Sequence, residues 1–277
     1  MPVDHYENFP VASILLPRHL RRPVELIYTF ARQADDFADE GELSDGERLS
    51  LLDGFRTELR CIESKGTDAS SSTPLFNALT GIIDKHALPV SALYDLLDAF
   101  SQDVVKKRYA NFGEVMEYCR RSANPVGRLL LHLYGMATPQ NLAYSDKICA
   151  SLQIINFLQD IEIDWQKNRI YMPQDEMAKF GVDENAIALK NTEGRWREFM
   201  QFQIDRVREM LASGAPLGWV LRGRIGLEMR MIIAGGLRIL EKIECEQGDI
   251  FRHRPVLRPA DWAVMLYRSL IPGQLTK

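Results

Sequence analysis

The chain has 277 residues, 46% of them hydrophobic and 26% charged, and a net charge of −4. This length suffices for a large core in one domain or two, and the slightly acidic balance excludes a global field that would attract nucleic acid. Four cysteines without CxxC or Cys/His spacing indicate free thiols in a reducing compartment. No signal-peptide layout or membrane-length apolar run is visible. We therefore expect a cytoplasmic protein.

Apolar residues recur at the helical spacings i, i+3 and i+4, whereas strand-like alternation is hard to find. A first helix is predicted from Pro23, which suits a first helical turn, to about Asp39, just before Gly41. Neither an internal repeat nor an interdomain linker is visible, so we predict one all-α domain over residues 1–277. The further helices predicted in chain order are 46–64, 74–86, 90–105, 112–136, 141–165, 192–212, 218–246 and 260–270.

The first predicted helix ends in the acidic segment ARQADDFADE, residues 31–40. Asp35 and Asp39 share one helix face, and Asp36 lies about 100° away from Asp35. Like charges repel, and the negative end of the helix dipole disfavours anions, so this cluster is costly without cations. A metal site would supply them, and a solvated helix end is the alternative interpretation.

A second polar stripe lies in SLQIINFLQDIEIDWQKNRIYMP, residues 151–173. Gln153, Asn156, Asp160 and Asp164 follow one another at spacings of three, four and four, on one helix face. The rest of this helix is apolar, which indicates burial, and buried carboxylates require cations. No comparable basic stripe is visible in the sequence. Two such helices facing one another would offer hard oxygen ligands to Mg²⁺, which also binds water and phosphate oxygens.

Several arginines accompany the two acidic segments. Arg32 lies three residues before Asp35 on the same face, and Arg169 follows the second stripe. Arginine suits phosphate oxygens, so both are predicted to bind substrate phosphate. For Arg32 an ion pair with Asp35 or Asp36 is the alternative. Arg121 is also predicted to bind substrate; for Arg120, Arg121 and Arg128, a solvated basic face is the alternative.

These two segments, with YCRRSANPVGRLLL at 118–131 between them, resemble the squalene/phytoene synthase family over nearly the whole chain. The resemblance implies an all-α isoprenoid synthase fold, with helices around a central apolar cavity and aspartates at its rim. It implies a prenyl diphosphate substrate, with Gln153 lining the site and Tyr171 near its mouth. The predicted Mg²⁺ ligands are Asp35, Asp36, Asp39, Asn156, Asp160 and Asp164.

The N-terminal segment HYENFP, residues 5–10, resembles the phosphate-binding segment of the family. His5, Asn8 and Phe9 are therefore assigned to substrate binding. The match is partial, because Tyr6 and Asn8 stand where hydroxyl residues are usual.

The segment RRSANPVG departs from the tyrosine and V-A-G turn typical of squalene and dehydrosqualene synthases, although Tyr118 remains. Pro125 is expected to kink the helix and free carbonyls near Arg121. Those carbonyls and Asn124 are candidates for holding a water. SANPVGR and ENFPVAS (7–13) resemble family members of bacterial hopanoid biosynthesis that convert presqualene diphosphate and water to hydroxysqualene and diphosphate. No nicotinamide fingerprint is present, so NADPH is not expected.

Other functions stay open at this point. Within the family, the alternative is head-to-head condensation of two prenyl diphosphates. Outside it, a dimetal nucleotide pyrophosphohydrolase and a non-catalytic helical scaffold are the competing interpretations. The basic segment LPRHLRRP, residues 16–23, is a weak indication of peripheral contact with the inner membrane. The sequence leaves the oligomeric state and the isoprenoid chain length open.

Overall fold

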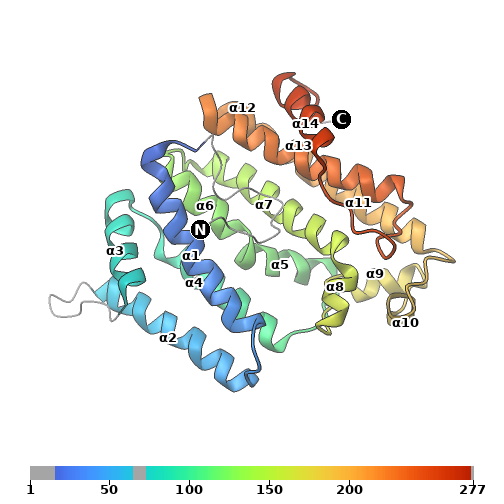
Figure 1. Cartoon of the computed structure of the whole chain (residues 1–277), viewed down its shortest axis with the longest axis horizontal. Coiled ribbons are helices and arrows are strands. Elements are labelled where there is room, and N and C mark those ends of the chain that lie inside the picture. Colours follow the sequence, from blue (N-terminus) through green and yellow to red (C-terminus); the bar gives the residue numbers. More distant parts are fainter. Residues whose placement is uncertain (1–15, 65–72, 276–277) are drawn as a thin grey trace.

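The computed structural model describes residues 16–64 and 73–275, and Figure 1 shows that this part of the chain is built from helices. Apart from one isolated bridge between Arg108 and Ile170, these residues form no β-structure. The predicted all-α fold is confirmed. The helices are α1 (Arg18–Asp39), α2 (Asp45–Ser64), α3 (Pro74–His86), α4 (Val90–Val105), α5 (Phe112–Ser122), α6 (Asn124–Leu133), α7 (Pro139–Gln159), α8 (Ile161–Gln166), α9 (Gln174–Lys179), α10 (Glu184–Ala188), α11 (Trp196–Gly214), α12 (Leu217–Val220), α13 (Gly223–Cys245) and α14 (Pro259–Leu270).

Two hydrophobic cores hold these helices together. The first joins α1 to α4 with α6, and the fully buried Phe30 lies at its centre against Phe55 and Phe76. The second joins α5, α7, α11, α13 and α14. Half-buried Tyr134 and Ile225 pack against both cores, so they mark the seam between them.

Helix α7 occupies the middle of the molecule and packs against α5, α6, α11 and α13 (Figure 1). Its approach to α11 is close because Gly214 ends α11 with no side chain. A Cβ on Gly214 would lie 2.8 Å from the carbonyl oxygen of Tyr144 and 2.7 Å from Ile148 Cγ1. The position of α7 matters because this helix carries Gln153 and Asn156, two of the predicted site residues.

The structure corrects several helix boundaries. Helix α1 begins at Arg18, so Pro23 lies inside it and not in its first turn. The segment predicted as one helix over 112–136 is interrupted at Ala123, just before Asn124 and Pro125. The helices predicted over 141–165 and 218–246 are each divided as well, at Asp160 and at residues 221–222. Apolar spacing continues through the last two interruptions, which is why the sequence pattern did not reveal them.

Replacing Gly214 with alanine should lower the free energy of unfolding by about 1–3 kcal/mol, because the added methyl group meets the fixed backbone of α7. Gly81 in α3 is the matched control, since a Cβ there meets no atom within 4 Å. Gly81→Ala should raise stability by about 0.5–1 kcal/mol through lower chain entropy in the unfolded state. Urea unfolding of both variants measures the difference, and equal effects would contradict the packing account.

Candidate active site

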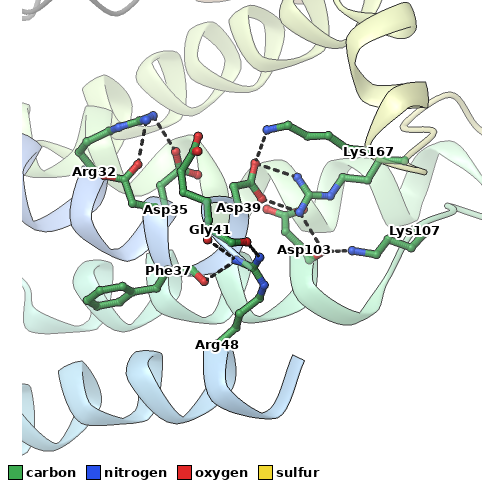
Figure 2. Close-up of polar contacts among 12 residues, drawn as sticks. Arg32, Asp35, Phe37, Asp39, Gly41, Arg48, Asp103, Lys107 and Lys167 are labelled. Carbon is green, nitrogen blue, oxygen red and sulfur yellow. Dashed lines mark hydrogen bonds and ion pairs between the residues drawn. The ribbon is translucent and has the colours of Figure 1, made fainter. Parts of the chain in front are cut away.

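The acidic face of α1 is the first part of the site. Asp35 and Asp36 both pair with Arg32, at 3.1 Å and 2.8 Å, so the ion pair that the sequence left as an alternative for Arg32 is formed. Figure 2 shows Asp35 and Asp39 along the same side of α1. Burial, and then the neighbouring charge of Asp39, raise the pKa of Asp35 to about 7.

A cation that the sequence did not single out compensates the end of α1. Arg48 of α2 donates hydrogen bonds to the carbonyl oxygens of Phe37 and Glu40, both at 3.0 Å, and to that of Gly41 at 2.7 Å (Figure 2). These carbonyls belong to the negative end of the helix, where a cation is favourable. Arg48 therefore offsets part of the cost of the acidic helix end.

Asp39 is the point where α1 meets the segment after α8. Its carboxylate accepts hydrogen bonds from Arg169, at 2.5 and 3.0 Å, and from Lys167 at 2.8 Å (Figure 2). Burial alone would raise the pKa of Asp39, but the hydrogen bonds from Arg169 and Lys167 outweigh it and lower that pKa. Buried Arg169 also donates to the carbonyl oxygen of Asp103 in α4 at 3.1 Å.

Next to the ion pair of Asp39 and Arg169 lies a buried carboxylate, Asp103, that the sequence analysis did not identify. Asp103 accepts hydrogen bonds from the hydroxyls of Tyr118 at 2.6 Å and Tyr171 at 2.9 Å. Tyr171 is buried, its ring stacked on Phe157 at a centroid distance of 3.9 Å. Burial raises the pKa of Asp103 to about 6, against the opposing effect of the Tyr118 hydrogen bond and Arg169. The sequence did not indicate this cluster of Asp103, Tyr118 and Tyr171, because Asp103 is a single aspartate in a segment with ordinary helical spacing.

The second stripe extends across two helices. Gln153 and Asn156 are half-buried on α7, Asp160 lies at the junction of α7 and α8, and Asp164 belongs to α8. Asp160 pairs with Arg254, which lies between α13 and α14. Among the residues that the structure describes, no basic stripe faces this polar stripe, and Asp160 instead takes a single basic partner, Arg254, from a segment distant in the sequence.

Asp164 differs from the other stripe carboxylates. Within the described part of the chain it forms no ion pair, and burial, followed by the charge of Asp160, raises its pKa to about 8. It lines a narrow cleft with no internal room for even a water molecule, together with Phe157, Ile161, Arg169, Ile170, Tyr171 and Met172. Ligand pockets usually enclose roughly 300–1,000 Å³, so an isoprenoid chain requires this region to open.

Carboxylates on α1 and α8 fit Mg²⁺ in their chemistry, since they are hard oxygen ligands whose mutual repulsion a cation would relieve. In the described residues no three acidic, histidine or cysteine side chains converge on one metal position. Arginines and a lysine hold Asp39 and Asp160 instead. Mg²⁺ bound with a diphosphate needs only one or two protein carboxylates, so the residues are compatible with a metal that arrives with its substrate.

Other predicted residues lie elsewhere or outside the described chain. Arg120 and Arg121 both pair with Glu117 on their own helix, at 2.9 Å. Arg128 pairs with Asp146 at 2.6 Å. The structure does not bring Arg121 into contact with the aspartates. His5, Asn8 and Phe9 precede the described residues.

Asn124 lies at the break between α5 and α6, with Pro125 as the second residue of α6. Only 7% of Asn124 is exposed, and its Oδ1 has no hydrogen-bond partner among the described residues. The kink expected at Pro125 is thus a full interruption of the helix, and it leaves one buried acceptor free.

The all-α fold thus brings two acidic segments together across basic side chains. Residues 3–261 match the family model for squalene/phytoene synthase, and the chain belongs to that family. It is an enzyme of isoprenoid biosynthesis that acts on prenyl diphosphates.

Individual relatives cover most of the chain. Hydroxysqualene synthase of Rhodopseudomonas palustris is 36% identical over 269 residues, 95% of this chain and 88% of the relative. Hydroxysqualene synthase of Sinorhizobium fredii is 34% identical over 92% of this chain and 85% of the relative. The crystal structure of squalene synthase HpnC from Alicyclobacillus acidocaldarius superposes with a TM-score of 0.80 and 32% identity, over 88% of this chain and 90% of that one.

Removing the Arg169 side chain should destabilise the fold, because Asp39 would keep its burial but lose two hydrogen bonds. We expect Arg169→Ala to lower the free energy of unfolding by about 3 kcal/mol. Arg22→Ala is the control, since Arg22 pairs with Glu25 in an exposed position and should change stability by less than about 0.5 kcal/mol. Denaturant unfolding measures both, and a loss at Arg169 no larger than the control would contradict its bridging role.

The metal-free protein should lose stability as the pH rises. Asp164 has a pKa of about 8 when folded, whereas an unfolded aspartate titrates near pH 4. Between these values the folded state binds the extra proton, so the stabilisation is complete below about pH 4 and is lost towards pH 8. Asp35 acts in the same direction.

The free energy of unfolding should fall less between pH 5 and 8 in Asp164→Asn than in the unchanged protein. The difference should be about 1 kcal/mol or more, the equivalent of one pKa unit. Asp53→Asn, on the exposed side of α2, is the control. Urea unfolding in the presence of a chelator measures the slope. A slope in Asp164→Asn that equals that of the unchanged protein would refute the burial of a neutral carboxyl group.

Proposed function

We propose that this enzyme converts presqualene diphosphate and water to hydroxysqualene and diphosphate, with Mg²⁺ and without NADPH, in hopanoid biosynthesis. The observation that carries the proposal is the free, buried Oδ1 of Asn124 at the helix break. A buried acceptor without a partner is costly, and a bound water satisfies it. Two relatives that bear the name hydroxysqualene synthase support the same reaction.

Diphosphate departure is the first chemical requirement. Arg32, Arg169 and Arg254 line the acidic region and can bind the oxygens of the leaving group as negative charge develops there. Bound Mg²⁺ would be held by Asp35, Asp36, Asp39, Asn156, Asp160 and Asp164 and would neutralise further charge on the diphosphate. Gln153, beside Asn156 on α7, adds a neutral polar contact on the same face.

The carbocation left behind needs apolar walls and one selected water. We place the hydrocarbon chain along the seam of the two cores, where Tyr134 and Ile225 are half-buried. The hydroxyls of Tyr118 and Tyr171 donate to Asp103, and burial raises the pKa of both tyrosines, so they stay neutral phenols. Water held at Asn124 then adds its oxygen to the cation, and the proton it releases passes to the departed diphosphate.

The second candidate is head-to-head condensation of two prenyl diphosphates. The observation in its favour is the name of the related solved structure, a squalene synthase with 32% identity. Tyr118, retained at the start of the altered segment, also favours it. The two reactions differ in substrate and in their need for a reductant, so product identification separates them.

Incubated with presqualene diphosphate and Mg²⁺ in ¹⁸O-labelled water, the enzyme should release hydroxysqualene that carries the label, without NADPH. Asn124→Ala should lower the hydroxysqualene formed per substrate consumed by at least about ten-fold, the size of one lost positioning contact. Asn141→Ala is the control for the loss of a buried asparagine. The Asn141 side chain donates a hydrogen bond to the carbonyl oxygen of Met136, in the loop before α7. Mass spectrometry of the products gives both ratios.

Chelation should abolish turnover and added Mg²⁺ should restore it, and Asp160→Ala should lower turnover by several orders of magnitude. Full activity in the chelated enzyme would overturn the metal proposal. Accumulation of presqualene diphosphate from farnesyl diphosphate, or NADPH-dependent squalene formation, would overturn the assigned reaction and leave the family unchanged.

A further inference from the structure

Helix α14 has its polar and apolar faces reversed relative to an ordinary surface helix. Its charged residue Asp261 is turned inward and pairs with Arg238 and Lys242, while Arg268 pairs with Glu241. Surface helices normally present charge to water and bury their apolar face. None of the exposed residues of α14 carries a charge: they are Pro259, Ala260, Trp262, Ala263, Leu266, Tyr267 and Leu270.

The exposed apolar surface continues onto α12. Trp219 and Val220 are exposed there, and Arg230 fastens α12 to α14 by donating to the carbonyl oxygens of Gly218 at 2.5 Å and Ser269 at 2.6 Å. Both helices lie along one edge of the molecule (Figure 1). We call this surface the α12–α14 patch; it comprises Trp219, Val220, Trp262, Leu266, Tyr267 and Leu270.

Exposed large apolar side chains grouped on neighbouring helices often mark a binding surface. Its composition indicates the partner: tryptophan and tyrosine prefer the boundary between hydrocarbon and headgroups, and leucine prefers the hydrocarbon. Two exposed arginines, Arg222 and Arg224, lie two and four residues after Val220. Arginines beside an apolar patch complement anionic lipid headgroups.

We propose that the α12–α14 patch docks the enzyme on the surface of a bilayer that contains anionic phospholipid. The described residues include no helix long and apolar enough to cross a membrane, so the contact is peripheral. Trp262, Leu266 and Leu270 enter the outer hydrocarbon, while Arg222 and Arg224 contact phosphate groups. The family acts on prenyl diphosphates, whose hydrocarbon chains partition into the same bilayer.

Sedimentation of the full chain with vesicles tests this docking without any substrate, so the outcome does not depend on the assigned reaction. Phosphatidylcholine vesicles that contain phosphatidylglycerol should carry the protein down, and pure phosphatidylcholine vesicles should carry down less. In Leu266→Ser/Leu270→Ser the vesicle partition coefficient should fall by at least about ten-fold, since the variant lacks two leucines that enter the hydrocarbon of the bilayer. In Arg222→Gln/Arg224→Gln the preference for the anionic vesicles should disappear.

Leu189→Ser is the matched control, because Leu189 is 76% exposed and lies outside the patch; its binding should equal that of the unchanged protein. Tryptophan emission supplies a second readout, since Trp219 and Trp262 should shift to shorter wavelength on anionic vesicles. Circular dichroism verifies that each variant is folded.

Two results would overturn the proposal. The first is unchanged vesicle binding in the folded Leu266→Ser/Leu270→Ser variant. The second is no vesicle binding by the unchanged protein, with a dimer in analytical ultracentrifugation that the same double variant converts to a monomer. That outcome would assign the patch to self-association.

Discussion

The hydrogen bonds of Arg169 hold together the three segments that make the acidic site. From the turn after α8, its guanidinium reaches Asp39 at the end of α1 and the backbone of Asp103 in α4. A buried arginine without partners would be very costly, so the carboxylate fixes the arginine as firmly as the arginine fixes the carboxylate. The positions of both acidic segments follow from this contact.

The aspartates around that contact do not share cationic partners equally, and this difference matters for the proposed chemistry. Asp39 and Asp160 have cationic partners, whereas Asp164 has none among the described residues and Asp35 shares Arg32 with Asp36. Burial, followed by the charge of a neighbouring carboxylate, raises the pKa values of Asp35 and Asp164. In the proposed reaction a diphosphate takes the arginines as its partners and its Mg²⁺ takes the carboxylates. In the free enzyme, ion pairs between these arginines and carboxylates hold both kinds of group at the site, where the proposed substrate complex needs them.

Polar side chains turn inward both at the acidic site and on α14, for different reasons. At the site, Asp103 holds the hydroxyls of Tyr118 and Tyr171 beneath the acidic rim. On α14, Asp261 and Arg268 turn towards α13, and the outward face is left to Trp262, Leu266 and Leu270. In the proposed reaction, the first arrangement would form a polar floor under the hydrocarbon chain of the substrate. The second leaves apolar side chains exposed for the proposed contact with lipid.

The sequence by itself determined the helical class, because apolar spacing directly reflects the period of a helix. It also determined that Asp35 and Asp39 share a face and that Gln153 and Asn156 share another, since both follow from local spacing. The helix break at Ala123 was foreseen as a kink from Pro125, whose ring cannot continue the hydrogen-bond pattern.

The local pair of Arg32 with Asp35 and Asp36 was visible in the sequence, but tertiary structure alone decided which cations meet Asp39 and Asp160. Asp39 and Arg169 are 130 positions apart, and Asp160 and Arg254 are 94 apart. Arg48, Lys167 and Arg254 stand in segments whose local pattern is that of ordinary surface residues. Ion pairs carry no periodic signal along the chain, because their partners are selected by the packing of whole helices. The reversed faces of α14 were hidden for the same reason, since an amphipathic pattern shows two faces but not which one turns inward.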